Sequence, residues 1–399
     1  MSAALLRNTQ PSPDGLTADQ AEILDQASSF ARETFHPLSQ RMDDEEWWPP
    51  EAMPALARMG FLGVTAPPEL GGAGSDLFTA GLITQGLARW NHSIALSYAA
   101  HENLCLNNIL RNGDEDVRAR FIPGMCDGTR IGALGLTEPG AGSDALGSMA
   151  TTARREGEDY VLNGRKLYIT NGPVADLVLV YAKTDRSLGA KGISAFVVEK
   201  GTPGFAVAQK LDKMGFRGST TAELTFDECR VPAANRVGRE NSGVAVVMSG
   251  LDLERAIVAM INVGMAERAL DLAVDYAKTR RQFGKAIGEF QLVQGKLADM
   301  YTTVEAMKAL CYRTLAAAND LETGAGGRGD IHRITAAAIL FAAEGCSRVV
   351  ADAVQVFGGV GYMREAEINR IYRASKLLEI GAGTTEIRKI IIAGELLRD

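Results

Sequence analysis

Residues Ser249 to Gly284 read SGLDLERAIVAMINVGMAERALDLAVDYAKTRRQFG, and this stretch decides the fold. Starting from Glu254, apolar residues recur at helical spacing: Ile257, Val258, Ile261 and Met265 follow on one stripe. Such spacing predicts an amphipathic helix. It continues without proline until the basic turn RRQFG, so the stretch predicts one long helix within a helical unit.

Working outward from this helix, the period of the apolar residues changes twice. Residues 16–130 show helical spacing, residues 131–240 show the alternation of strands, and residues 241–399 return to helical spacing. In the central region, DYVLNGRKLYITNG predicts a hairpin that turns at Asn163-Gly164, because Asn-Gly favours tight hairpin turns. The order predicts an α+β protein of three domains, with a small β domain between two helical ones.

Composition excludes several function classes. The chain has 399 residues, 46% of them hydrophobic, and 42 Lys and Arg against 49 Asp and Glu, for a net charge of −7. This size and hydrophobicity predict a globular protein with a large core. The charge balance argues against a nucleic-acid surface, and no continuous apolar run is long enough to span a membrane.

The cysteines and the start of the chain concern the compartment. Five dispersed cysteines, with no CxxC or Cys/His spacing, predict neither a disulfide framework nor a zinc site, so no metal is expected. The first residues, MSAALLRNTQPSPDG, lack the long apolar run of a secretory signal and the arginines of a transit peptide. We expect a cytoplasmic protein, and a processed organellar enzyme is the alternative.

Several common cofactor-binding and catalytic motifs are absent from the sequence or lie in the wrong context. The letters GAGGRG, Gly324 to Gly329, fit a dinucleotide-binding fingerprint but follow a helix rather than a strand, which predicts a loop. The chain contains no Walker loop, no GxSxG and no HExxH, and its four histidines have no nucleophile at a telling spacing. Hydrolysis by a catalytic triad is therefore not indicated.

Glu254 is the most unusual carboxylate in the sequence. Its neighbours three and four residues away are Gly250, Leu251, Ile257 and Val258, so no charge on the same helix face can pair with it. Burial on an apolar face would raise its pKa toward the range of a general base. Alternatively, Glu254 turns outward at a helix start or meets an arginine from elsewhere in the fold. Asp252 and Arg255, by contrast, are spaced to support each other.

The segment LEIGAGTTEIRK, Leu378 to Lys389, is a glycine-punctuated loop that leads into a helix. Thr384 or Thr385 can cap that helix, and Glu386 lies in its first turn, where a carboxylate suits the helix dipole. The tightest part of the loop, Gly381-Ala382-Gly383, offers no side chain for chemistry.

Five ordered motifs together resemble the acyl-CoA dehydrogenase family: LTEPGAGSD, KLYITNG, RRQFGKAIGEFQLVQGKLADM, QVFGGVGY and EIGAGTTEIRK. The resemblance covers the chain from about residue 18 onward. It implies an N-terminal helical domain, a central β-barrel-like domain and a C-terminal four-helix bundle. It also implies FAD and the oxidation of acyl-CoA thioesters to 2,3-enoyl-CoA, with a carboxylate removing the α-proton while flavin N5 accepts the hydride.

In most members the catalytic base precedes the Gly-Thr of the last motif, where this chain has Ala382. In a smaller group, which includes isovaleryl-CoA dehydrogenases, the base lies on the earlier helix at the position of Glu254. The resemblance therefore implies that Glu254 is the base. MSGLDLER with EIGAGT, LSYAAHENLC and KLDKMGFRGS all look most like the isovaleryl group.

The resemblance also assigns binding residues, by position. It implies flavin or thioester contacts for Leu134, Leu136, Thr137 and Ser143, with Tyr168, Ile169 and Thr170 behind the isoalloxazine ring. FAD contacts to a neighbouring subunit fall on Arg280, Phe283, Gln291, Gln355, Val356, Phe357, Gly358 and Gly359. Thr384, Thr385 and Glu386 complete the cofactor site. Substrate contacts fall on Ser143, Asp252, Leu253, Arg255, Ala382 and Gly383, with CoA itself expected at Asp252 and Arg255.

These assignments predict an FAD-dependent dehydrogenase of a short branched acyl-CoA such as isovaleryl-CoA, passing electrons to electron-transfer flavoprotein as a homotetramer. Departures from the isovaleryl pattern affect the acyl group: Met260 and Ile261 replace small residues, Tyr168 replaces the usual Trp, and Glu102 replaces a small polar residue. The alternatives are a dehydrogenase or oxidase of a longer or modified acyl thioester, and a non-catalytic acyl-CoA-binding homologue.

Overall fold

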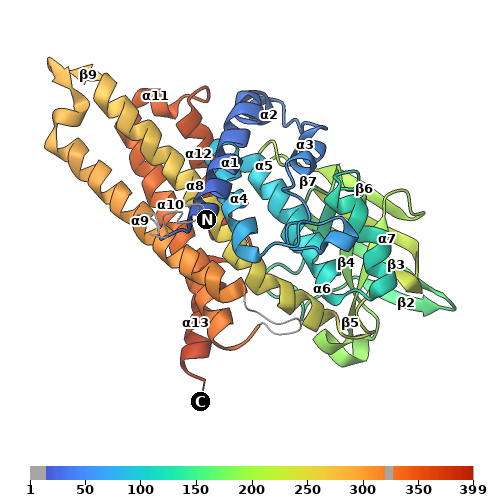
Figure 1. Ribbon diagram of the computed structural model, residues 1–399. Helices are drawn as coiled ribbons and strands as arrows, with labels where there is room; N and C mark the ends of the chain where they lie inside the picture. The colour runs from blue at the N-terminus through green and yellow to red at the C-terminus, as the bar shows by residue number, and fades with distance from the viewer. Residues whose placement is uncertain (1–14, 320–326, 399) are drawn as a thin grey trace, which may run out of the picture.

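The computed structural model describes residues 15–319 and 327–398. Helices come first and last in the chain, and the strands lie between them, which confirms the α+β class predicted from the apolar period (Figure 1). Element types change between Cys126 and Gly132 and again between Val237 and Gly243. The exact domain limits stay a prediction, because these changes do not show where folding units separate.

The N-terminal part is helical. Its helices are α1 (Ala18–Thr34), α2 (Ser39–Asp44), α3 (Ala52–Arg58), α4 (Leu77–Trp90), α5 (His92–Ala99), α6 (Asn107–Asn112) and α7 (Glu115–Cys126), with short 3-10 turns η1 (His36–Leu38) and η2 (Pro68–Leu70). Between α5 and α6 the chain widens into a π-helix, η3 (Ala100–Leu106). Such widened turns are uncommon and are frequent at functional sites. The π-helix packs against β1 and α8, two of the elements that carry predicted site residues.

The central part is a mixed sheet. Its strands are β1 (Gly132–Gly135), β2 (Thr152–Glu156), β3 (Asp159–Thr170), β4 (Leu177–Lys183), β5 (Ile193–Glu199), β6 (Phe205–Lys210), β7 (Thr221–Pro232) and β8 (Arg236–Val237), with 3-10 turns η4 (Arg186–Gly192) and η5 (Ala233–Asn235). The strand order is β6-β7-β3-β2-β4-β5-β8, and β1 adds to β4 in parallel.

The sheet curls so that one face encloses its own core. Inward side chains of β3, β4, β5 and β7, such as Leu162, Val180, Phe196 and Leu224, share one apolar cluster. Alternate residues of β4 and β5, such as Leu179, pack outward on the helices in a second cluster. This is the two-sided alternation that a curled sheet between helices requires. Between β6 and β8, the ends of the described strand order, no pairing closes a ring.

The predicted hairpin at Asn163-Gly164 is wrong. Residues Asp159 to Thr170 form the single strand β3, and the turn to its partner β2 lies earlier, at Gly157. Opposite β7 the register shifts at Asn163, which marks a β-bulge. The Asn163 amide is bonded to Glu228 across this bulge. The extra residue of the bulge lies on β7, where Glu228 has a φ of +48°, so the local sequence around Asn163-Gly164 did not show that this pair continues a strand.

The C-terminal part contains the long helix that the opening stretch predicts. Its elements are α8 (Gly243–Thr279), β9 (Arg281–Gln282), β10 (Lys285–Ala286), η6 (Ile287–Glu289), α9 (Gln291–Asn319), α10 (Gly329–Phe357), α11 (Gly359–Tyr362), α12 (Glu367–Ser375), η7 (Lys376–Glu379) and α13 (Thr385–Leu396). Helix α10 packs against α8, α9 and α13, and these four helices form the expected bundle. The β9-β10 hairpin lies at the far tip of the bundle (Figure 1).

Two further features bear on the compartment. By length and composition, α10 could cross a membrane, since its most apolar window has a mean hydropathy of 1.5. However, 56% of that window is buried, and a core helix packed against three others passes the same test. All five cysteines are buried and free. Of the glycine run predicted to be a loop, residues 324–326 lie outside the described residues, and Gly327 and Arg328 form bends before α10. Residues 1–14 of the chain start also lie outside the described residues.

Candidate active site

Glu254 lies in the fourth turn of α8 and is 8% exposed. Among residues 15–319 and 327–398, its carboxylate makes no hydrogen bond and no ion pair within 4 Å. Burial raises its pKa from 4.5 to about 7, against the opposing charges of Arg255 and Arg388. The result is a carboxylate with free lone pairs whose pKa is near neutrality, as a general base requires.

Asp252 and Arg255 pair as their spacing predicts, with 3.0 Å between Arg255 Nη1 and Asp252 Oδ1. Asp252 has no exposed surface, and both of its oxygens accept hydrogen bonds from this chain. The expected contact of Asp252 with CoA stays a prediction. Leu253 is also buried, within the apolar core. Arg255 is 4% exposed and stays a predicted ligand contact.

The loop before α13 is fixed beside Glu254 by two arginines. Arg255 Nε donates to the Ala382 carbonyl oxygen at 3.4 Å, and Arg388 Nη2 donates to the carbonyl oxygens of Leu378, at 2.8 Å, and Gly381. Ala382 has a φ of +56°, a conformation that costs a residue with a Cβ some strain. The loop therefore presents only backbone and a methyl group to the neighbourhood of Glu254.

Thr384 caps α13, as one of the two predicted candidates, by accepting from Ile387 N at 3.3 Å. Glu386 is exposed in the first turn, where backbone N–H groups and Thr384 hold its pKa below the usual value. The helix start beside the loop thus keeps a negative charge and a hydroxyl at its surface, as predicted from the sequence.

The residues predicted for the flavin ring gather on β1, β3 and the loop between β1 and β2. The strand ends are joined by a hydrogen bond from Leu167 N to Thr137 O at 2.8 Å. The Lys166 ammonium adds bonds to Leu136 O, at 3.1 Å, and to Glu138, at 2.8 Å. Burial lowers the pKa of Lys166 to about 8. This buried ion pair fixes the two strand ends side by side.

Exposed side chains suited to a planar ring lie next to that pair in the sequence. Tyr168 is 66% exposed, although large aromatic side chains are seldom exposed without a partner. It projects from a bulge of β3 with a φ of +62°, next to Ile169, which is buried. Leu134, Leu136, Thr137 and Thr170 are partly exposed, and Ser143 is exposed. Apolar and hydroxyl side chains therefore line an open platform of the kind that an isoalloxazine ring would cover.

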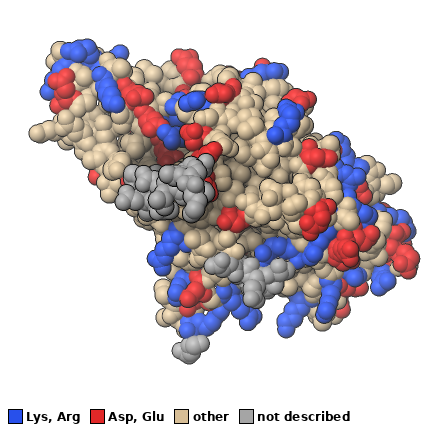
Figure 2. Space-filling view, viewed as in Figure 1, with Lys and Arg blue, Asp and Glu red and all other residues tan. Residues whose placement is uncertain are grey.

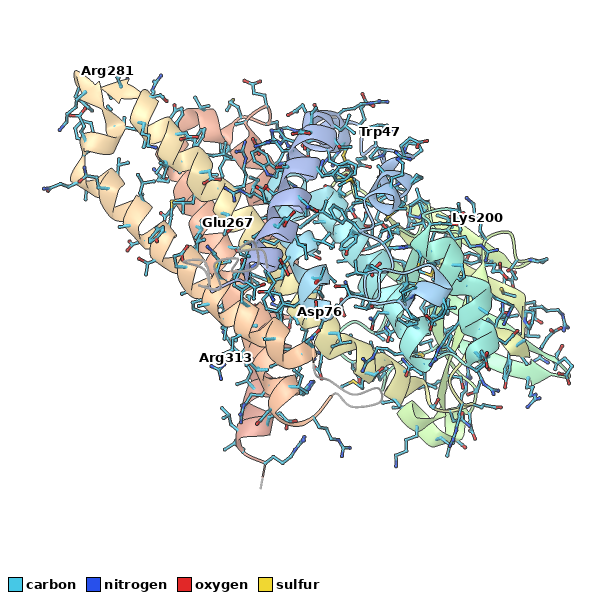
Figure 3. All side chains as sticks on the ribbon, in the orientation of Figure 1. Trp47, Asp76, Lys200, Glu267, Arg281 and Arg313 are labelled. Atoms are coloured by element: carbon cyan, nitrogen blue, oxygen red, sulfur yellow. The ribbon has the colours of Figure 1, made fainter. Side chains whose placement is uncertain are left out.

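The structure does not bring Arg280, Phe283 and Gln291 to Glu254. They lie at the opposite end of α8, where Figure 3 labels the adjacent Arg281. The 26 residues from Glu254 to Arg280 correspond to about 40 Å of helix. Phe283 is 93% exposed at this tip. Gln355 to Gly359, at the end of α10, are exposed or partly exposed except Val356, which is buried.

The sequence did not single out Arg388 and His332 as site residues. Arg388 is fully buried on α13, and its Nε and Nη1 have no partner among the described residues. His332, on α10, is buried against Asp252. The only sequence signal was their type, because an arginine or histidine on a buried helix face needs an acceptor.

A cavity of about 480 Å³ lies elsewhere, between the ends of α1, α4 and α9. Its lining includes Leu16, Phe78 and Tyr312, and it shares no residue with the predicted sites. Gly15 and Asn319, which border the undescribed segments, also line it. It is therefore separate from the constellation around Glu254.

Comparison with known proteins identifies the family. Models of three acyl-CoA dehydrogenase domains match the chain: the N-terminal domain over residues 17–129, the middle domain over 133–229 and the C-terminal domain over 241–397. The mitochondrial isovaleryl-CoA dehydrogenase of Pongo abelii is 42% identical over 388 residues, which cover 95% of this chain and 89% of that protein.

Solved structures agree with these matches. Butyryl-CoA dehydrogenase from Megasphaera elsdenii superimposes with a TM-score of 0.91 at 37% identity, covering 96% of this chain and 99% of that one. PigA with FAD and proline has a TM-score of 0.90 at 30% identity, covering 96% and 98%. This chain therefore belongs to the acyl-CoA dehydrogenase family, whose members are flavoprotein oxidoreductases that act on the CH–CH group of acyl-CoA.

Proposed function

We propose that this protein is an FAD-dependent dehydrogenase of a short branched-chain acyl-CoA, with Glu254 as the base that takes the α-proton. The observation that carries the proposal is the state of Glu254: it is buried, no donor from residues 15–319 and 327–398 bonds to it, and its pKa is raised to about 7. The neighbouring loop, where Ala382 stands, has no carboxylate that could take this role.

The site residues of this chain have separate roles in the proposed reaction. Glu254 accepts the proton at a carboxylate oxygen, and Arg255 and Arg388 stabilise its ionised form by their charge. The platform of Leu134, Thr137 and Tyr168 would hold the flavin ring and exclude water. FAD, when bound there, would supply the hydride acceptor. Backbone N–H groups of the platform can bond to charge that develops on the ring.

The substrate class is supported by the isovaleryl-CoA dehydrogenase relative at 42% identity and by the position of the base on α8. Met260 and Ile261, which replace small residues of the isovaleryl pattern, are both fully buried in the core around α8. A side chain of that size leaves less room nearby than glycine would. A longer or modified acyl thioester is therefore the alternative substrate.

We further propose a homotetramer that passes electrons to electron-transfer flavoprotein in the cytoplasm. The exposed Phe283 and the distance of about 40 Å from the tip of α8 to Glu254 support contact between subunits, because the tip residues cannot reach their own site. They can serve the cofactor only in a neighbouring chain. The electron acceptor follows from the family resemblance.

The test is anaerobic bleaching of the flavin absorbance by a panel of acyl-CoAs. We expect isovaleryl-CoA to bleach the wild-type protein, and Glu254→Gln to slow bleaching by roughly 10²- to 10⁴-fold while FAD stays bound. The matched control is Glu267→Gln on the same helix. Burial also raises the pKa of Glu267, but Gln85 donates to its carboxylate, so this variant should bleach at the wild-type rate.

Each outcome has a distinct meaning. Bleaching by other chains alone would leave the base assignment intact and overturn the substrate. Rapid oxygen consumption during turnover would favour an oxidase. A flavin that no thioester bleaches would favour a non-catalytic acyl-CoA-binding protein, and loss of FAD from Glu254→Gln would show that Glu254 is structural.

A further inference from the structure

Asp252 is the centre of a buried hydrogen-bond network that joins three segments of the chain. Its Oδ1 accepts from His332 Nδ1 at 2.7 Å, Arg255 Nη1 at 3.0 Å and Thr335 Oγ1 at 3.3 Å. Its Oδ2 accepts from Gly327 N at 2.6 Å. Burial opposes ionisation of this carboxyl, but the bonds from His332 and Gly327, with the charge of Arg255, keep its pKa below the usual value.

The geometry fixes the tautomer of His332. Asp252 is ionised and can only accept, so His332 Nδ1 must carry a proton in order to donate to it. Arg255 Nη1, 3.3 Å from the same ring nitrogen, is also a donor only. The two groups therefore do not bond to each other but converge on one carboxylate oxygen. Removing either donor leaves a buried acceptor underused.

Arg255 connects this network to the base. One nitrogen of its guanidinium is held by Asp252, and another donates to the Ala382 carbonyl oxygen. The residue follows Glu254 directly in the chain, and its charge opposes the effect of burial on that carboxylate. An arginine side chain has many rotamers, so a buried acceptor that fixes its orientation also fixes its distance to Glu254.

We propose that His332, acting through Asp252, is a positioning residue that holds the Arg255 guanidinium against the Ala382 carbonyl, from where its charge acts on Glu254. His332 touches no reacting atom in this arrangement. It keeps Asp252 oriented, Asp252 keeps Arg255 in place, and Arg255 keeps the base ionised near neutral pH. The inference rests on the proposed role of Glu254 as the base.

Other charged groups face the same carboxylate and must be held constant. Arg388 on α13 lowers the pKa of Glu254, and Arg388 is itself influenced by Glu379 on η7 and Glu344 on α10. Tyr181 on β4 is also close enough for the charge of Glu254 to raise its pKa. None of these groups bonds to His332, so a change at position 332 leaves them in place.

The first test needs no substrate. Replacing Glu254 with Gln in the FAD-bound protein removes the buried charge, so the difference in melting temperature between the two forms reports the ionisation of Glu254 as pH rises. The same pair is then measured with His332→Ala. We expect the midpoint of this difference to move to higher pH by about 0.5 to 1 unit, because a nearby opposite charge typically shifts a carboxyl by 1 unit or more.

Two variants control for a merely structural effect. His332→Asn keeps an amide nitrogen near the position of Nδ1 and should restore the wild-type midpoint. His92→Asn changes another packed histidine. His92 lies on α5, and its ring packs against Phe216. This variant should lower the melting temperature without moving the midpoint. An unmoved midpoint in His332→Ala, or the same midpoint in His332→Ala and His332→Asn, would overturn the inference.

The second measurement separates this inference from the proposed function. The rate of anaerobic flavin bleaching by isovaleryl-CoA is followed from pH 5 to pH 9 for wild type, His332→Ala and His332→Asn. We expect the acidic limb of His332→Ala to move upward by the same amount as the thermal midpoint. If wild type never bleaches but the thermal midpoint moves, the proposed function fails and the positioning role stands.

Discussion

Glu254 and Glu102 are both buried carboxyls whose pKa burial raises to about 7, but their surroundings differ. The Glu102 oxygens accept backbone N–H bonds from Gly63, at 2.8 Å, and Val64, at 2.7 Å. Glu254 accepts none from the described residues. A raised pKa alone therefore does not identify a base in this protein, and the free lone pairs of Glu254 make the difference.

The pH dependence of turnover follows from Glu254. A base works only when deprotonated, and the pKa of this carboxyl is about 7, so we expect the bleaching rate with saturating thioester to fall about tenfold per unit below pH 7. Stopped-flow absorbance from pH 5 to pH 9 measures the bleaching rate, and the flavin content is checked at each pH. A rate that stays constant down to pH 5 would exclude Glu254 as the base.

Glu102 leads to a prediction about the stability of the folded protein that does not depend on catalysis. Its pKa in the folded state lies above the unfolded value of 4.5, so its contribution to stability is present below about pH 4.5 and is lost as pH rises to about 7. Glu102→Gln mimics the protonated form. We expect it to match wild type at low pH and to become more stable by up to about 3 kcal/mol at pH 8.

Thermal melting at pH 5 and pH 8 tests the Glu102 prediction. The informative quantity is the change in the stability difference between the two pH values, because a constant offset would arise from packing alone. An offset that is equal at both pH values would show that Glu102 does not titrate in this range.

At the scale of the element, α8 is defined by close packing along its middle. Every residue from Asp252 to Ala266 is buried, as expected of a helix surrounded by others. Gly264 lies where α8 meets α4, and a Cβ there would lie 2.4 Å from the Gln85 carbonyl oxygen and 2.9 Å from the Arg89 nitrogen. These are backbone atoms of α4, so they cannot move aside to make room for a Cβ as the end of a flexible side chain can.

Gly264→Ala should therefore destabilise the protein by about 1–3 kcal/mol, although alanine is the better helix former. The matched control is Gly394→Ala in α13, where a Cβ meets no described atom from outside its own turn of helix within 4 Å. This variant should be neutral or slightly stabilising. Chemical denaturation of both variants measures the difference. Equal effects would mean that α4 and α8 separate more easily than their packing indicates.

Local sequence predicted those elements whose cause is local. The long helix followed from its own apolar period, and the Asp252–Arg255 pair and the Thr384 cap followed from spacings of three residues. Asn163-Gly164 was misassigned because the strand that pairs with it, β7, is about 60 residues away in sequence. The π-helix at Ala100–Leu106 had no local signal at all, since its sequence suits an α-helix equally well.

The candidate site shows the same division. Glu254 could be nominated from its apolar neighbours, but the groups that set its charge state come from distant positions. His332 is 80 residues from its partner Asp252. Arg388 acts on Glu254 from a different helix. The sequence shows which residue types are available, and only the packing of α8 with α10 and α13 shows which of them meet.

At the scale of the whole molecule, charge is dispersed. Figure 2 shows acidic and basic side chains interspersed over the visible face, as the balance of 42 basic and 49 acidic residues suggests. The exposed apolar side chains are more informative, and they include Phe283, Leu292 and Tyr362. Apolar exposure of this kind is typical of surfaces that contact another chain.

Phe283→Ala tests this at the level of assembly. Phe283 is 93% exposed, and its ring meets Phe290 edge-on, so its removal should hardly change the unfolding of a single chain. We expect weaker self-association and lower retention of FAD, both measured by light scattering coupled to size exclusion with flavin absorbance. Unchanged mass and flavin content would contradict the proposed role of the tip between subunits.

The length of α8 has a mechanical consequence. Helix α8 carries Glu254 near one end, and the β9-β10 hairpin follows its other end. Over a lever arm of about 40 Å, a tilt of one degree about the Glu254 end displaces the hairpin by about 0.7 Å. Any tilt of α8 that a ligand at Glu254 produced would therefore be largest at the β9-β10 hairpin.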